Sequence, residues 1–222
     1  DRMIEKYYNG VIEQVAGGIG NVEHNSILVR YSNDFSIWDL ESVNHYKDQT
    51  DIFFTCHEFS YNKIAEAYEP YLGLIRQMFH KYCSGTLEEF MEECDVYKLQ
   101  RPVFESYFEK GFCERTEQIL IDEVEYEQER MRNSIVTMLQ KLSEIRPVVI
   151  VLNRFQLASK STMQLSNSLL QVKNKNIGIV LGVNDVQSIP EFAHEEWDAI
   201  CESMDDRNMV YHIGNAGRNM EP

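Results

Sequence analysis

The residues best placed for chemistry follow the apolar segment 148–152, where the chain passes into a polar turn. Asn153 and Arg154 come directly after that segment, and Ser159 and Lys160 precede a stretch with helical spacing. Turns between a strand and a helix are where α/β proteins bind phosphates, because the helix N-terminus offers free N–H groups. A metal ion at such a turn needs carboxylates. This turn offers an amide, a guanidinium, a hydroxyl and an ammonium, so it is suited to phosphate contact and not to metal binding.

A second polar turn follows the apolar segment 26–31. Residues 30–38 read Arg-Tyr-Ser-Asn-Asp-Phe-Ser-Ile-Trp, without a glycine or a lysine. A phosphate-binding loop needs glycines, so that backbone N–H groups can wrap the phosphates, and a lysine to neutralise them. Ser32, Asn33 and Ser36, together with Arg154, are therefore candidates for a degenerate nucleotide site only. Asp34 adds negative charge at the position where phosphates would lie.

Two other groups of residues were weighed for chemistry. His57 and Glu58, at the end of a predicted strand, are an acid–base pair in a functional location, but the chain has no G-x-S-x-G or H-E-x-x-H motif to accompany them. His80 and Cys83 share a helix face and, with Cys94, suggest a metal site without a fourth ligand. Structural roles are the simpler interpretation of both groups.

Hydrophobic spacing predicts the elements that must position these residues. The predicted strands cover 26–31, 51–56, 148–152, 177–181 and 209–213. The predicted helices cover 3–16, 36–45, 64–83, a segment from Thr86 with Glu89 completing a capping box, 102–110, 115–145, 161–173 and 189–204. Strands that alternate with helices indicate an α/β fold with a five-stranded, mainly parallel sheet covered on both faces. Residues of about 84–146, without a strand, indicate a helical insertion in one domain that spans 1–222.

The order of these elements resembles a P-loop NTPase, and more narrowly the AAA-like ATPase domain of the STAND class of bacterial signalling proteins. The resemblance is strongest over residues 148–170, and residues 177–184 extend it. There the family has an apolar strand, two acids, an aromatic-rich turn, another acid and a helix. In this chain Asn153 and Arg154 stand in place of the two acids, and Ser159 in place of the later one, while Thr162 and Leu165 of the helix persist.

Both halves of the family's nucleotide site thus lack the residues that bind phosphate and metal in the family. Ser36 stands near the position of the P-loop lysine and Ile37 near that of the hydroxyl. Without them and the acids, Mg-nucleotide hydrolysis has no visible means. The resemblance therefore implies a pseudo-ATPase with a regulatory or scaffold role, no catalytic residues and no required cofactor. The alternative is a switch that holds ATP or ADP without fast hydrolysis, with Arg30, Arg154 and Lys160 as phosphate contacts. A switch of this kind requires that Arg154 is not paired with Asp34 or Glu58. We expect that pairing instead if Arg154 fills the vacated metal position.

Composition narrows the expected partners. The net charge of −15 disfavours nucleic acid and anionic membranes as partners of this domain. Five cysteines without a C-x-x-C motif fit unpaired thiols in a reducing compartment, which indicates a cytoplasmic location. The chain does not begin with Met, so we expect it to be excised from a longer signalling or transcription-regulatory protein. Its expected partners are then neighbouring helical repeats or an output module, another protein, or a second copy.

Overall fold

The computed structural model describes residues 2–111, 125–185, 189–206 and 210–213. The chain divides into two compact units, of which the first joins residues 1–67 to 146–222 and the second comprises residues 68–145. The predicted insertion of about 84–146 falls almost entirely within the second unit. The predicted tail beyond residue 213 lies outside the described residues.

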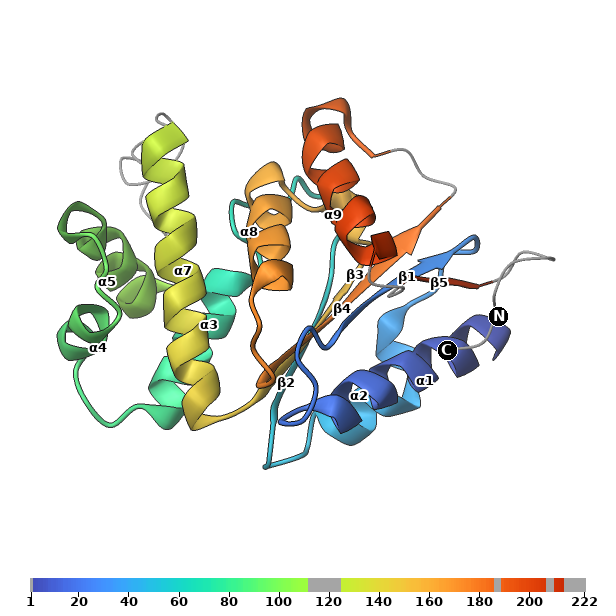
Figure 1. The fold of residues 1–222 in the computed structure, drawn as a ribbon, viewed down its shortest axis with the longest axis horizontal. Coiled ribbons are helices and arrows are strands. Elements are labelled where there is room, and N and C mark those ends of the chain that lie inside the picture. Colours follow the sequence, from blue (N-terminus) through green and yellow to red (C-terminus); the bar gives the residue numbers. More distant parts are fainter. Residues whose placement is uncertain (1, 112–124, 186–188, 207–209, 214–222) are drawn as a thin grey trace. The chain divides into compact units, whose positions relative to one another are not determined.

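The first unit is built on a parallel sheet (Figure 1). Its main strands are β1 (Ser26–Tyr31), β2 (Phe53–Glu58), β3 (Val148–Asn153) and β4 (Ile177–Asn184), and the four-residue β5 (Val210–Ile213) pairs with β1. The strand order is β2-β3-β4-β1-β5, and each neighbouring pair is parallel. The predicted α/β class with a parallel sheet is confirmed. The register places Glu58 beside Asn153 and Tyr31 beside Asn184, so the carboxyl ends of the strands meet at one edge.

Helices lie on both faces of this sheet (Figure 1). One face carries α1 (Arg2–Gly18) and α2 (Glu41–Tyr46), and the other carries α8 (Lys160–Gln171) and α9 (His194–Asp206). On the α1 face, Val11 and Val15 belong to one buried cluster with Val149, Val151 and Val180. Since side chains alternate along a strand, the buried residues between them pack toward α8 and α9. These include Leu28, Ile150, Leu152, Ile179 and Leu181.

Two glycines of β4 allow α1 to approach the sheet closely. Gly178 and Gly182 alternate with Val180, so all three positions face α1. A Cβ added at Gly178 would collide with Val15, and one added at Gly182 would collide with the hydroxyl of Tyr8 and with the side-chain oxygen of Asn153. The glycines are therefore required by packing rather than by backbone conformation.

The second unit is helical. It contains α3 (Tyr71–Tyr82), α4 (Leu87–Glu93), α5 (Arg101–Lys110) and α7 (Glu125–Ile145). The predicted capping box is confirmed, because the Thr86 hydroxyl accepts from the Glu89 N–H while the Glu89 carboxylate accepts from the Thr86 N–H. No helix within the described ranges is both long and apolar enough to cross a membrane.

Several predicted boundaries were wrong. The helix predicted at 64–83 begins only at Tyr71, because Tyr68 has a left-handed backbone (φ 59°) and Pro70 disfavours a helical residue before it. The helix predicted at 36–45 is split into a 3-10 turn, Ile37–Asp39, and α2, with Leu40 extended between them. Strand β2 lies two residues later than predicted, and β4 continues to Asn184.

At the C-terminal side, a 3-10 turn (Glu191–Ala193) precedes α9, which begins at His194 rather than at 189. The predicted helix 115–145 is seen from Glu125 onward, and its first ten residues lie outside the described residues.

Candidate functional site

The candidate site lies at the carboxyl edge of the sheet, where β1, β2 and β3 end. Strand β3 ends at Asn153, and Arg154 follows with a left-handed backbone (φ 56°). The chain then enters the 3-10 turn Phe155–Leu157, in which the Phe155 side chain is fully buried. Burial of Phe155 and the end of the strand together fix the position from which the Arg154 side chain extends.

Arg154 binds two carboxylates, one from the turn after β1 and one from the end of β2. Its Nε and Nη2 donate to Asp34 Oδ1 and Oδ2 at 3.2 and 3.0 Å, a two-bond fork. Its Nη1 lies 3.2 Å from Glu58 Oε1. Burial on its own would lower the pKa of Arg154, but the hydrogen bonds to Asp34 and the charges of Glu58 and Asp34 outweigh burial and raise it. The predicted pairing of Arg154 with Asp34 or Glu58 is confirmed with both. We call these three residues and Tyr61 the Arg154 clamp.

Tyr61 completes the clamp from the segment after β2. Its hydroxyl donates to Asp34 Oδ1 at 3.0 Å, and the Arg154 guanidinium carbon lies 4.6 Å from the centre of its ring. A cation over an aromatic face is attractive, and the attraction is stronger where water is partly excluded.

Glu58 is the buried member of the clamp, with only 9% of its side chain exposed. Its Oε2 accepts from the backbone N–H of Ile37 and from the Asn153 amide, both at 2.9 Å. Ile37 opens the turn after β1, which is the position where a phosphate-binding loop would present its N–H groups. In this chain a carboxylate of the protein accepts from that N–H.

A buried hydrogen-bond network lies directly behind the clamp. Asn153 is fully buried, and its side-chain oxygen accepts from the hydroxyls of Tyr31 at 2.8 Å and Tyr8 at 3.4 Å. Burial raises the pKa of both tyrosines well above the ordinary value. Sequence reasoning identified Asn153 only as a replaced acid and did not identify Tyr8 or Tyr31. The available signal was a tyrosine at a position predicted to be buried, on the apolar face of the first helix or at the end of the first strand, because a buried tyrosine hydroxyl needs a hydrogen-bond partner.

The other candidate residues of the degenerate site lie outside these contacts. Ser32 is partly exposed and Asn33 is exposed. Ser36 occupies the N-cap position of the 3-10 turn, and its side chain makes no capping hydrogen bond there. Of the four candidates, Arg154 is the one that the structure places in the clamp.

The other two predicted phosphate contacts have separate carboxylate partners. Arg30 lies 2.6 Å from Asp185 and stacks over Trp197, with 5.8 Å from its guanidinium carbon to the ring centre. Lys160 lies 3.6 Å from Glu196. Each of the three cations is thus paired with at least one acid of its own, and a phosphate would have to compete with these acids.

His57 and Glu58 do not form a catalytic dyad. They are consecutive residues of β2, so their side chains point to opposite faces of the sheet. The His57 ring packs edge-on against Phe59, with the ring centres 4.8 Å apart. The acid–base hypothesis therefore has no support from the geometry.

The metal hypothesis also receives no support within the part of the chain that is described. No group of three or more His, Cys, Asp or Glu side chains there is placed to hold a metal ion. The His80 ring nitrogen instead lies 3.3 Å from the Phe108 carbonyl oxygen. Cys56, Cys83, Cys94 and Cys201 are thiols.

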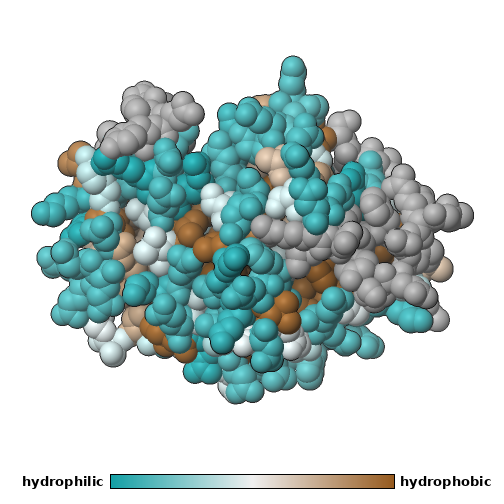
Figure 2. Space-filling model, in the orientation of Figure 1, coloured by the Kyte–Doolittle hydropathy of each residue, from teal (hydrophilic) through white to brown (hydrophobic). Residues whose placement is uncertain are grey.

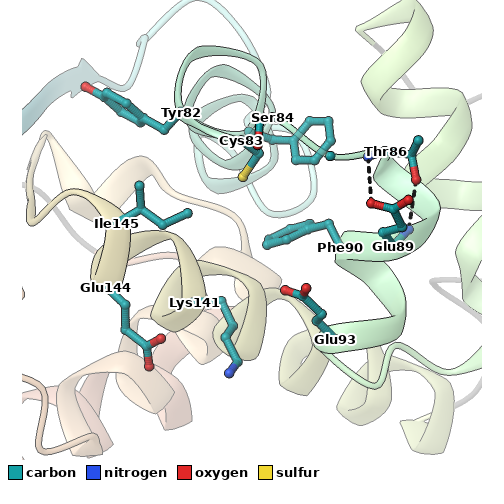
Figure 3. A pocket seen from close by; sticks show the side chains of 12 residues that line it. Tyr82, Cys83, Ser84, Thr86, Glu89, Phe90, Glu93, Lys141, Glu144 and Ile145 are labelled. Carbon is teal, nitrogen blue, oxygen red and sulfur yellow. Dashed lines mark hydrogen bonds between the residues drawn. The ribbon is translucent and has the colours of Figure 1, made fainter.

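The second unit has an open pocket of about 310 Å³ (Figure 3). Phe79, Phe90 and Ile145 supply apolar walls, and Glu93 and Lys141 lie at its rim. Both rim charges are exposed, so water screens their attraction for a ligand. Burial and Glu93 raise the pKa of the Cys83 thiol in this pocket, which leaves it a poor nucleophile at neutral pH.

Comparison of the chain with family models, with curated proteins and with solved structures finds no match.

Proposed function

We propose that this chain is a non-catalytic, pseudo-ATPase domain with a regulatory or scaffold role in a signalling or transcription-regulatory protein. The observation that carries the proposal is the Arg154 clamp. Where the resembled ATPases hold metal and phosphate, this protein places a guanidinium between two of its own carboxylates.

The sheet supports the P-loop NTPase-like part of this proposal. Read from the β5 edge, the strand order is β5-β1-β4-β3-β2, with helices on both faces. This is the three-layer arrangement with a parallel sheet that the resemblance implies. The strand order differs from the orders of the two common dinucleotide- and flavin-binding folds, in which β1 lies next to β2 or β3.

Electrostatics support the loss of nucleotide chemistry. A bound polyphosphate would lie against Asp34 and Glu58, and like charges at contact distance repel strongly where water is excluded. The Ile37 N–H donates to Glu58, and Arg154 is held by both acids. A nucleotide would therefore have to break the clamp before it could use either donor.

The proposed partners are proteins. A net charge of −15 opposes contact with nucleic acid and with anionic membranes. The face drawn in Figure 2 is mostly hydrophilic, with apolar residues in small separate groups. We therefore propose contacts with neighbouring domains of the same polypeptide, such as helical repeats or an output module, in the cytoplasm of a bacterium.

The second candidate function is a nucleotide-binding switch without fast hydrolysis. It is favoured only by the presence of Arg30, Arg154 and Lys160 at the carboxyl ends of strands or the start of the following helix. ATP or ADP then has to replace a carboxylate at each cation it uses.

Calorimetric titration with ATP and ADP, with and without Mg²⁺, separates the two candidates. The proposal expects no binding heat and no thermal stabilisation by ligand. Micromolar binding that is lost in Arg154→Ala but kept in Arg101→Ala, a matched arginine removal in the second unit, would instead establish the switch.

A further inference from the structure

Residues 59–67 are the last residues of the first unit before the chain passes into the second unit. They follow β2 without a helix or strand of their own and lead toward α3. The side chain of Ile64 in this segment is 93% exposed. Irregular segments with exposed backbone are the parts of a protein that open most easily.

Contacts of Phe59 and then of Tyr61 hold the start of this segment against the rest of the first unit. Phe59 is buried, and its N–H donates to the Asn153 carbonyl at 3.1 Å. Tyr61 is then held by Asp34, through its hydroxyl, and by the Arg154 guanidinium over its ring. Tyr61 is 42% exposed, so burial alone does not fix its position, and these contacts restrain it.

The Tyr61 contacts depend on Arg154. The fork from Arg154 orients the Asp34 carboxylate that Tyr61 donates to, and the same guanidinium supplies the cation over the Tyr61 ring. Glu58 in turn holds Arg154 from the end of β2. One guanidinium therefore connects the exits of β1, β2 and β3.

We propose that the Arg154 clamp is a conformational lock on residues 59–67. It holds Tyr61 and so limits local opening of the backbone of this segment. When Arg154 is bound to Asp34, the segment is restrained just before Lys63; when that pairing is broken, this restraint is lost and the segment opens more often. The lock is formed in the protein without a nucleotide, so its test needs none.

Limited proteolysis of the whole chain with trypsin tests this lock. The Lys63 side chain is 67% exposed, so trypsin reaches it in either state, and the cleavage rate depends on local opening of the backbone. Cleavage after the exposed Lys173, in the loop after α8 of the same unit, is the reference: a change there that matches the change at Lys63 would indicate a loss of stability of the whole unit.

We expect Tyr61→Ala and Arg154→Ala to accelerate cleavage after Lys63 by about five- to thirtyfold, the effect of losing a modest interaction. Cleavage after Lys173 should be unchanged in Tyr61→Ala. Tyr61→Phe keeps the ring over the guanidinium and should give an intermediate rate. Phe192→Ala, which removes another exposed aromatic side chain of the first unit, should have no effect at Lys63.

Tyr61→Ala keeps the test decisive if Arg154→Ala does not fold, because Tyr61 is largely at the surface. An unchanged rate after Lys63 in Tyr61→Ala overturns the lock. Equal acceleration after Lys63 and Lys173 in that variant also overturns it, because the effect would then be unfolding of the unit rather than release of the segment.

Discussion

Arg154 in the first unit and Arg101 in the second each contact a carboxylate, and these two pairs differ in where the carboxylate lies. Arg154 of the first unit contacts Glu58, whose side chain is 9% exposed. Arg101 of the second unit contacts Glu92, whose side chain is 71% exposed, at 2.6 Å. The shorter contact is thus the one at the surface.

The burial of the carboxylate decides what each pair does. The hydrogen bond and charge of Arg101 lower the pKa of Glu92, but Glu92 remains hydrated without its partner, so loss of the pair leaves no desolvated charge. Glu58 lies under the turn after β1, and its charge has to be balanced within the protein. The contact distances alone would suggest that the Arg101–Glu92 pair matters more for stability than the Arg154–Glu58 pair, the opposite of what burial predicts.

The largest expected effect is the loss of stability in Arg154→Ala. Removing one partner of a buried ion pair leaves an uncompensated charge, so we expect the free energy of unfolding to fall by about 3 kcal/mol. Arg101→Ala should cause a much smaller loss. Urea unfolding followed by circular dichroism measures both.

The double variant Arg154→Ala with Glu58→Gln sharpens this result. Because the glutamine carries no charge, it should recover a large part of the lost stability, which gives a measurable coupling energy between the two sites. Equal losses in Arg154→Ala and Arg101→Ala would show that burial of the carboxylate does not distinguish the pairs.

A second effect, on the buried tyrosines of the first unit, is expected at high pH. Burial raises the folded-state pKa of Tyr8 and Tyr31 above the value of about 10 in an unfolded chain. Their contribution to stability is therefore complete below pH 10 and is lost as the pH rises above it, by up to about 1.4 kcal/mol per tyrosine and pH unit.

Urea unfolding between pH 8 and pH 11, with tyrosinate absorbance as the second signal, checks this expectation. Burial also raises the pKa of the thiols of Cys56, Cys83, Cys94 and Cys201, which adds losses that begin near pH 9. Cys56→Ala is the background for the comparison, because the charge of this thiol acts on Tyr8. Tyr8→Phe with Tyr31→Phe in that background should flatten the decline above pH 10. An equally steep decline would place its cause elsewhere.

The sequence predicted the elements whose signal is local. Continuous apolar runs such as residues 148–152 became strands, and Thr86 with Glu89 became a capping box. The pairing of Arg154 was also predictable, because the carboxyl ends of parallel strands meet at one edge and bring Asp34, Glu58 and Arg154 together.

What the sequence did not predict depends on contacts between distant residues. The spacing of Tyr68 to Tyr82 is helical, but the left-handed backbone at Tyr68 and the position of Pro70 delay the helix to Tyr71. Tyr8 and Asn153 are 145 residues apart, and no local pattern records that their side chains meet. The predicted site residues Ser32, Asn33 and Ser36 came from family position, which carries no information on hydrogen bonding.

The smallest expected effect compares the two tyrosines that donate to Asn153. Tyr31 donates at 2.8 Å and Tyr8 at 3.4 Å, to the same buried oxygen. Tyr31→Phe removes the stronger bond and should lower the free energy of unfolding by about 1 kcal/mol. Tyr8→Phe should lower it by only a few tenths of a kcal/mol. Both rings keep their edge-on contact with Phe35 in these variants, so the difference in urea midpoint reports the hydroxyls alone. If Tyr8→Phe were the more costly change, the shorter contact would not be the one that holds Asn153, and the buried support of the Arg154 clamp would have to be assigned to α1 rather than to β1.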